Sequence, residues 1–308
     1  MGKDSREESV GFVGLGDMGG PMVGNLLKSN RSLVVYDLQK AKVDRAVELG
    51  AQAGSGPADI ARRARIMISM VDTTAQAEEV IVGAGGFIES VRAGDVVISM
   101  STIDPIALQR MHGKLAAMGV ALIDAPVSGM DKGAREGTLK AFVGGDAEAL
   151  EKVRPVLQAM CSEITHIGAI GQGCVMKMIN NMLAQINRIV VAEALVLGAK
   201  AGLDPKVMFE LIGKATGNSA AFQIYAPRMI AHDFKGSRMD ITFKDMELQT
   251  ALGNSLKVPL FMATIAQQVC QMGRAAGYGS EDGSAVVKVY EQFAGVKLSD
   301  ERIRQHVA

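Results

Sequence analysis

The sequence has no tryptophan, few aromatic residues and only three cysteines. The cysteines, Cys161, Cys174 and Cys270, are far apart and odd in number, which excludes a disulfide framework and the paired spacing of a cysteine zinc site. The four histidines are equally scattered, so we expect neither a metal centre nor a serine–histidine triad. Because few, unpaired cysteines are typical of a reducing compartment, we expect a cytoplasmic protein.

An excess of one charge sign is also missing. Lys plus Arg number 33 and Asp plus Glu number 33, so the formal net charge is zero and the basic footprint of a nucleic-acid-binding protein is absent. No uninterrupted apolar run reaches the roughly 18 residues that span a bilayer. The polar start, MGKDSREES, has no apolar signal region. We therefore expect no nucleic-acid or membrane partner, and a disordered tail over residues 1–9.

Glycine, by contrast, is abundant, and three glycines near the start form a motif. Residues 10–20 read VGFVGLGDMGG, with the spacing G-x-G-x-x-G after a short apolar run. A helical pattern and a second apolar run follow, and the order strand, glycine turn, helix, strand is typical of a dinucleotide site. The first glycine permits the tight turn, the second leaves room for a pyrophosphate, and the third lets the helix pack closely. The residues expected at the cofactor are Gly14, Leu15, Gly16, Asp17, Met18 and Gly19.

An acid completes this motif, because Asp37 ends the second apolar run, 18 residues after Gly19. Its carboxylate can accept both hydroxyls of the adenosine ribose, and its charge would repel a 2′-phosphate, which favours NAD over NADP. Lys40, Lys42 and Arg45 lie close in sequence and could receive such a phosphate instead, or they could line the solvated face of the next helix. We expect NAD, with NADP as the alternative.

The length of 308 residues suggests about two domains. In the first half, short apolar runs alternate with helical patterns, which predicts a parallel, doubly wound α/β sheet over residues 10–167. After Gly168 the patterns are helical, starting with a long helix from about Cys174 to Gly202, and no convincing strand follows. We expect residues 168–308 to form an all-helical substrate and oligomerisation domain. The strands are expected at 10–13, 33–36, 66–71, 96–100, 121–123, 140–143 and 164–167.

In a doubly wound sheet, ligands bind beyond the carboxyl ends of the strands. Besides the glycine turn, three loops are expected there: one around Val71 and Asp72, one at Ser101 and Thr102, and one that begins at Asp124 and contains Ser128. The three hydroxyl groups could hold a ribose, a nicotinamide or a carboxylate. Taken alone, such residues are more often turn or cap residues, and both interpretations stay open at this point.

A lysine in the long predicted helix is the candidate acid/base. Lys177 and Asn181 lie four residues apart and so share one helix face, among largely apolar neighbours. Desolvation would lower the pKa of such a lysine, which suits it to proton transfer near neutral pH. Alternatively, its stem lies along the helix and its charge reaches solvent.

Four motifs in one order resemble the β-hydroxyacid dehydrogenase family, which includes 3-hydroxyisobutyrate dehydrogenases and tartronate semialdehyde reductases. They are GLGDMG from Gly14, DAPVSGMDKGAREGTL from Asp124, GQGCVMKMINN from Gly171 and FKD from Phe243. The resemblance runs from about residue 10 to 290. It implies a Rossmann-type domain and a helical domain joined by a long helix, a small carboxylate substrate, and a homodimer or homotetramer.

The resemblance also assigns roles. Lys177 would be the catalytic acid/base, while Ser128, Gly129 and Asn181 would hold the substrate. Thr102 and Lys244 would contact the cofactor. The reaction implied is hydride transfer between a nicotinamide and a small β-hydroxyacid or its semialdehyde.

Three positions depart from the family pattern. Met130 stands where members often have glycine and would reshape the substrate wall, and Val71-Asp72 replaces a common Leu-Pro at the cofactor edge. Ala184 stands where the related 6-phosphogluconate dehydrogenases have an acid, which argues against a coupled decarboxylation. The alternatives are a non-catalytic cofactor-binding module and an imine reductase-like enzyme, and Lys177 argues against both.

Overall fold

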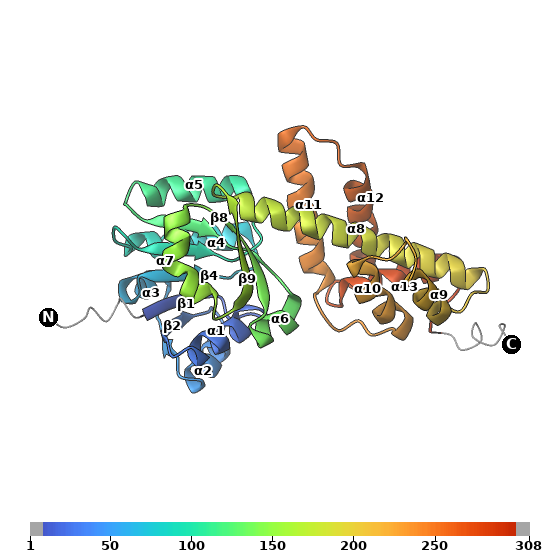
Figure 1. The fold of residues 1–308 in the computed structure, drawn as a ribbon, viewed down its shortest axis with the longest axis horizontal. Coiled ribbons are helices and arrows are strands. Elements are labelled where there is room, and N and C mark those ends of the chain that lie inside the picture. The colour runs from blue at the N-terminus through green and yellow to red at the C-terminus, as the bar shows by residue number, and fades with distance from the viewer. Residues whose placement is uncertain (1–8, 300–308) are drawn as a thin grey trace. The chain divides into compact units, whose positions relative to one another are not determined.

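A computed structural model describes residues 9–299 of the chain, which divide into two compact units (Figure 1). The first unit ends at Lys177 and the second begins at Met178, inside a long helix. The domain boundary at residues 167 and 168 stays a prediction. The tail predicted over residues 1–9 lies outside the described residues except for Ser9, which contradicts it by opening the first strand.

The first unit is built on a nine-stranded sheet, and every predicted strand is present. Two short strands, β3 and β7, were not expected. The bounds are β1 Ser9–Val13, β2 Ser32–Tyr36, β3 Gln52–Ala53, β4 Ile66–Ser69, β5 Val96–Ser99, β6 Ala121–Asp124, β7 Val127–Ser128, β8 Leu139–Gly144 and β9 Cys161–Gly168.

The sheet is parallel only in part. The strands from β3 through β2, β1, β4 and β5 to β6 pair in parallel, as predicted for a doubly wound sheet. β8 then pairs with β6 and β7 in antiparallel fashion, while β9 runs parallel to β8. The prediction of a parallel sheet was therefore wrong at β8. The connection from β6 to β8 contains the short strand β7 and one short helix, rather than a crossover that returns the chain in the parallel sense.

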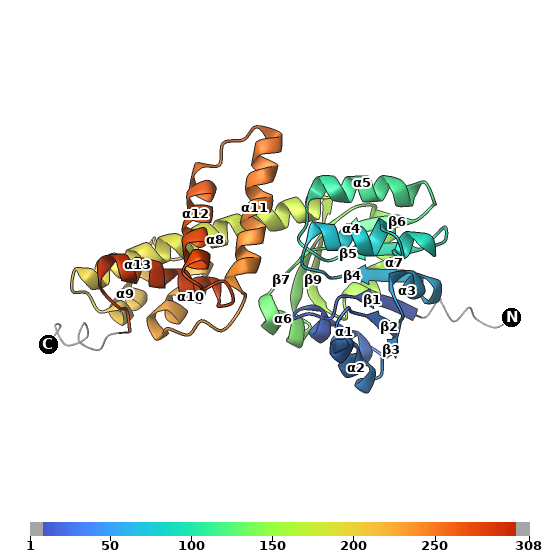
Figure 2. The same cartoon turned by 180° about the vertical axis from the view of Figure 1, so that it is seen from behind.

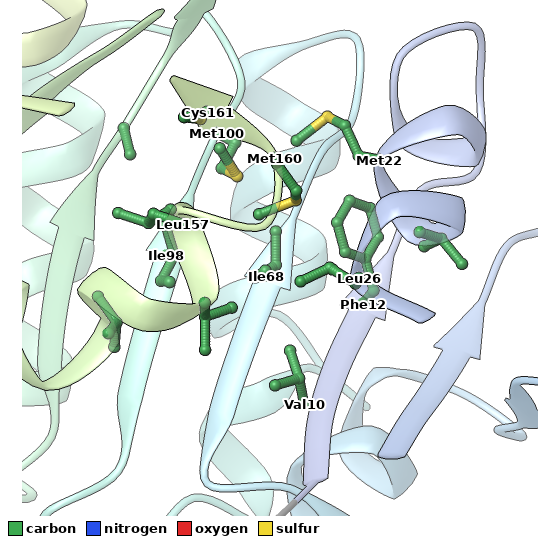
Figure 3. Close-up of a cluster of buried hydrophobic side chains, with 14 of the residues drawn as sticks. Val10, Phe12, Met22, Leu26, Ile68, Ile98, Met100, Leu157, Met160 and Cys161 are labelled. Atoms are coloured by element: carbon green, nitrogen blue, oxygen red, sulfur yellow. The ribbon is translucent and has the colours of Figure 1, made fainter. Parts of the chain in front are cut away.

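Helices cover both faces of the sheet (Figures 1 and 2). Side chains from α1, α2, α6 and α7 share one apolar core with alternate strand residues, among them Phe12, Ile68 and Ile98 (Figure 3). Side chains from α3, α4 and α5 share the other core with the intervening strand residues, such as Met67 and Val97. The helix bounds are α1 Gly19–Lys28, α2 Lys40–Glu48, α3 Pro57–Arg63, α4 Thr74–Val82, α5 Pro105–Ala116, α6 Met130–Glu136 and α7 Ala147–Leu157.

Local capping explains where several helices begin. Asp104 accepts the Ile106 N–H and Pro105 follows it, as predicted for the start of α5. Thr73 forms a capping box with Gln76 at α4. Two seven-residue helices were missed. α3 and α6 each span about two turns, too short to display a helical period.

The second unit is helical throughout its described residues, as predicted. α8 runs from Gln172 to Lys200 and is followed by helices around one apolar core. The sequence did not indicate α10, because Pro227 inside it reads as a helix breaker. The remaining bounds are α9 Pro205–Ile212, α10 Ala220–Ala231, α11 Met239–Leu256, α12 Phe261–Ala275, the 3₁₀ turn η2 Gly283–Val286, and α13 Val287–Ala294.

Helix α8 is long and apolar enough in composition to cross a membrane, and within residues 9–299 no other helix is. Half of its most apolar stretch is buried inside the protein. A buried core helix meets the same criteria of length and composition, so this feature supports a membrane span only weakly.

Candidate active site

Each glycine of the turn meets a different physical requirement. Gly14 has φ +98°, and a Cβ there would collide with the Met70 carbonyl. A Cβ on Gly19 would collide with the Gly14 carbonyl and lie 3.2 Å from the Phe12 ring. A Cβ on Gly16 would meet nothing within 4 Å. Thus Gly14 and Gly19 are required by the fold, whereas the space at Gly16 is open to a ligand.

The helix that follows the turn is also open at its start. No side chain caps α1, whose N-cap residue is Met18, and Asp17 beside it is exposed. The first backbone N–H groups of a helix have no partner within the helix, and they carry partial positive charge. An uncapped start beside an empty glycine position fits a pyrophosphate.

Asp37 directly follows β2 and is bonded to this turn. Its Oδ2 accepts the Leu15 N–H at 2.7 Å, and its Oδ1 accepts the Gln39 N–H at 2.8 Å. Each carboxylate oxygen retains a free lone pair, because a carboxylate can accept about four hydrogen bonds. Asp37 can therefore hold the turn and still accept the two hydroxyls of a ribose.

The second and third loops are joined to each other and to the glycine turn. The Val71 N–H donates to Ser101 Oγ at 2.8 Å, and a Cβ on Gly14 would lie 3.2 Å from Val71 Cγ1. Ser101 is buried, so its hydroxyl ties the two loops together rather than facing a ligand. Thr102 is half-buried and Asp72 is exposed, with the Asp72 N–H donating to Gln76.

The fourth loop has an unusual backbone. Ser128 ends β7 and lies opposite Lys140 of β8 in the antiparallel pair. Gly129 follows with φ +134°, and Met130 has φ +57°, a conformation that costs a non-glycine residue about 1–2 kcal/mol. Met130 begins α6 with its side chain 37% exposed. The departure from glycine therefore places a strained, exposed methionine directly after Ser128-Gly129.

The start of α8 is held near the same loops, at the carboxyl ends of the strands. Cys174 Sγ lies 3.4 Å from the Ser101 carbonyl, and a Cβ on Gly171 would lie 3.2 Å from the Pro105 carbonyl. Lys177, half-buried, is three residues beyond Cys174. The helix start that bears Lys177 therefore lies against the third loop, next to the loop that contacts the glycine turn.

Sequence reasoning assigned no role to Asp124, the last residue of β6. Its side chain is fully buried, with Oδ1 accepting the Gly171 N–H and Oδ2 the Cys174 N–H, each at 2.7 Å. Burial raises the pKa of this carboxyl, and the two backbone hydrogen bonds partly oppose that rise. An aspartate at the end of an otherwise apolar strand was the available signal.

A second polar group lies in the helical unit. Asn181 Nδ2 donates to Asp245 Oδ2 at 2.8 Å, and Lys244 Nζ lies 3.1 Å from Asp245 Oδ1. Asp245 is buried, with only 7% of its surface exposed. The structure thus brings together Asn181 and Lys244, two predicted site residues, through an acid that the FKD motif contains but to which the sequence assigned no role.

Among the described residues, no three His, Cys, Asp or Glu side chains gather in a way that could hold a metal ion.

Comparisons with known proteins find dehydrogenase families over both parts of the chain. Residues 9–168 match the family described as the NAD binding domain of 6-phosphogluconate dehydrogenase. Residues 171–290 match the NAD-binding family of NADP-dependent 3-hydroxyisobutyrate dehydrogenase. One curated relative is 2-(hydroxymethyl)glutarate dehydrogenase of Eubacterium barkeri, 41% identical over 94% of this chain and 97% of its own length. Another is the NAD-dependent L-serine dehydrogenase of Pseudomonas aeruginosa, 35% identical over 94% of this chain and 99% of its own.

Solved structures extend the likeness to the fold. The 3-hydroxyisobutyrate dehydrogenase of Mycobacterium tuberculosis with L-serine is 28% identical and covers 92% of this chain and 99% of its own, with a TM-score of 0.84. An imine reductase from Pseudomonas sp. is 18% identical with a TM-score of 0.57, a likeness of fold alone. The matched families and relatives cover both units, and the glycine turn fits a dinucleotide. The chain is therefore an NAD(P)-binding oxidoreductase that belongs to the β-hydroxyacid dehydrogenase family.

Proposed function

We propose that this enzyme transfers a hydride between a nicotinamide cofactor and a small β-hydroxyacid, with Lys177 as the acid/base. The observation that carries the proposal is the attachment of the α8 start to Ser101 and Asp124. This attachment keeps Lys177 near the carboxyl ends of the parallel strands, where the glycine turn and its neighbouring loops lie.

The residues of the turn support the cofactor assignment. The open position at Gly16, the uncapped start of α1 and the free lone pairs of Asp37 fit the pyrophosphate and a ribose. The charge of Asp37 favours NAD over NADP. The bound nicotinamide supplies or accepts the hydride. Thr102 and Lys244 are proposed to contact the cofactor, with Val71 and Asp72 at its edge.

Lys177 has the chemistry that the proton step requires. During oxidation its neutral amine takes the hydroxyl proton of the substrate, and during reduction its ammonium returns that proton to the carbonyl oxygen. Asn181, one turn further along α8, offers an amide to the same hydroxyl. The hydrogen bond from Asn181 to Asp245 orients that amide, because the Asp245 oxygen can accept only from the NH₂ group.

The loop after β7 is suited to a carboxylate. Ser128 Oγ and the Gly129 N–H are two donors in succession, and the Lys140 ammonium lies on the same face, one strand away. Lys140 is paired with Glu163 at 2.9 Å. Both side chains are more than half exposed, so exchanging one carboxylate partner for another costs little.

The names of three relatives share one pattern of substrate. 2-(Hydroxymethyl)glutarate, L-serine and 3-hydroxyisobutyrate each carry a hydroxymethyl group on the carbon that bears the carboxylate. They differ only in the third substituent of that carbon. We therefore propose a 2-substituted 3-hydroxypropanoate as the substrate, with the carboxylate at Ser128 and the substituent near Met130.

We further propose a homodimer or homotetramer in the cytoplasm. Large apolar side chains are exposed on the helical unit, for example Leu197 at 73% and Phe293 at 71%, and both line one hollow of its surface. Exposed apolar area of this kind is typical of a surface that a partner covers. All three cysteines are free and buried, in keeping with a reducing compartment.

A spectrophotometric panel with the Lys177→Ala variant tests the proposal. The wild-type enzyme should reduce NAD with L-serine, 3-hydroxyisobutyrate or 2-(hydroxymethyl)glutarate, and Lys177→Ala should lose at least about 100-fold in kcat. NADH binding, followed by fluorescence, should change little, because the glycine turn is untouched. Near-normal turnover in Lys177→Ala, or turnover of cyclic imines but of no hydroxyacid, would refute the assignment.

A further inference from the structure

We infer that Asp124 is a positioning residue that sets the location of Lys177 by holding the first turn of α8. The inference rests on the proposed function in one respect, because it takes Lys177 as the acid/base. It concerns residues of the first unit only.

The contact has the form of a helix cap supplied from a distant strand. A helix start leaves four N–H groups without intrahelical partners. Asp124 accepts two of them, from Gly171 just before α8 and from Cys174 within its first turn. The first i to i−4 bond at this end runs from the Val175 N–H to the Gly171 carbonyl. One carboxylate at the end of β6 therefore fixes the position of the first turn of the helix.

The surroundings of Asp124 leave room for this carboxylate and little else. A Cβ on Gly173 would lie 2.8 Å from Asp124 Oδ2, and a Cβ on Gly144 would collide with Oδ1. Both glycines thus let the backbone approach the carboxylate closely. Gly173 and Gly171, the latter at φ +89°, explain why the GQGC segment before Lys177 is rich in glycine.

A buried ion is costly, so its retention requires a compensating benefit. Burial disfavours the charged form of Asp124, and no basic side chain contributes to its pKa. The Cys174 thiol is the other titratable group at the carboxylate. An apolar residue would remove the desolvation cost but would leave two buried N–H groups unpaired. What the aspartate provides is a defined geometry at the helix start.

Lys177 is the first charged residue of α8, so its position depends directly on where the helix starts. It lies three residues beyond Cys174, about 4.5 Å further along the helix axis. At that distance a shift of the helix start moves the lysine almost undiminished.

The test compares two buried aspartates of the same unit. Asp95 is also almost fully buried and accepts a backbone N–H, from Arg92. It precedes β5 and so lies at the amino-terminal ends of the strands, away from the glycine turn. Asp124→Asn and Asp95→Asn should both lower Tm. Asp124→Asn alone should lower kcat, by about 10- to 100-fold, the usual penalty for misplacing a catalytic group by about 1 Å. KM and NADH affinity should stay within about twofold of wild type.

The split between kcat and KM provides a readout that lost stability would not move. A misplaced acid/base lowers the kcat of the folded enzyme with little change in KM, so kcat, expressed per folded molecule, should fall in Asp124→Asn and not in Asp95→Asn. Equal losses of kcat in the two variants would overturn the inference. If Lys177→Ala retains turnover, the proposed function fails first, and this distinguishes the two failures.

A second pair of variants decides the matter if Asp124→Asn does not fold. Cys174→Pro removes the N–H that Asp124 accepts, at a first-turn position where proline is tolerated. Cys174→Ala keeps that N–H and loses the same thiol. A lower kcat with an unchanged KM in Cys174→Pro, absent in Cys174→Ala, would support the inference. Identical behaviour of the two would contradict it.

Discussion

Asp37 Oδ2 accepts the Leu15 N–H at 2.7 Å, across 22 residues of sequence. The acid proposed to bind the adenosine ribose therefore also holds the backbone of the glycine turn. A single carboxylate thus couples the shape of the phosphate site to the choice of cofactor.

Alanine at Gly16 and at Gly14 should have opposite effects. A Cβ on Gly16 enters open space, so Gly16→Ala should keep the Tm of wild type. It should weaken NADH binding about tenfold or more, equivalent to about 1.4 kcal/mol, by occupying the proposed pyrophosphate position. Gly14→Ala should instead fold poorly, because of its positive φ and the Met70 carbonyl. Thermal unfolding and fluorescence titration measure both, and an unchanged affinity in Gly16→Ala would contradict the placement.

Two substitutions of Asp37 separate its charge from its structural contact. Asp37→Asn removes the charge but keeps an acceptor for the Leu15 N–H, so it should raise the NADP to NAD ratio of kcat/KM with little loss of Tm. Asp37→Ala should shift the ratio too and also lose about 1–3 kcal/mol of unfolding free energy, because a buried donor is left unpaired. If neither variant changed the ratio, Asp37 would not select the cofactor.

Ser128→Ala should raise KM for hydroxyacids and cost about 1–3 kcal/mol in kcat/KM, since one charge-assisted hydrogen bond to the carboxylate is lost. The matched control is Ser162→Ala, whose exposed hydroxyl donates to the Thr138 carbonyl and should leave kcat/KM unchanged. Equal kcat/KM values for the two variants would show that Ser128 does not bind the substrate.

Met130→Gly should change substrate choice without unfolding the protein. Glycine relieves the positive φ at residue 130, and the greater freedom of the unfolded chain offsets this gain, so the unfolding free energy should stay within about 1 kcal/mol. The ratio of kcat/KM between 3-hydroxyisobutyrate and 2-(hydroxymethyl)glutarate should change, because their third substituents differ in size. An intact substrate profile would show that Met130 does not line the pocket.

The buried thiols should resist modification in the folded protein. Burial raises the pKa of Cys161 to about 12 and that of Cys270 to about 11, above the ordinary 9.0. The folded state thus keeps protons that the unfolded chain loses, so these thiols reduce stability as pH rises from about 9 toward 11. At pH 8, native protein should react slowly with an aromatic disulfide reagent and react quickly in guanidinium. Rapid labelling of native Cys161, identified by mass spectrometry, would contradict this burial.

The amino-acid sequence by itself determined the glycine turn with its acid and the order of the longer elements. The glycine turn, its strand and Asp37 lie within about 30 residues, and local backbone rules set their spacing, so the pattern could be read directly. Long helices such as α8 and α11 display their period in the sequence. The short helices α3 and α6, and α10 with its internal proline, do not.

Only the tertiary structure decided how the candidate catalytic residues are held. Asp124 reaches Gly171 and Cys174 across 47 and 50 residues, and Asn181 reaches Asp245 across 64. No local pattern marks such partners, because they are chosen by strand order and helix packing after the chain has folded. The antiparallel edge at β8 arises in the same way. Its apolar run is that of any strand, and the direction in which it pairs depends on how the chain between β6 and β8 folds back.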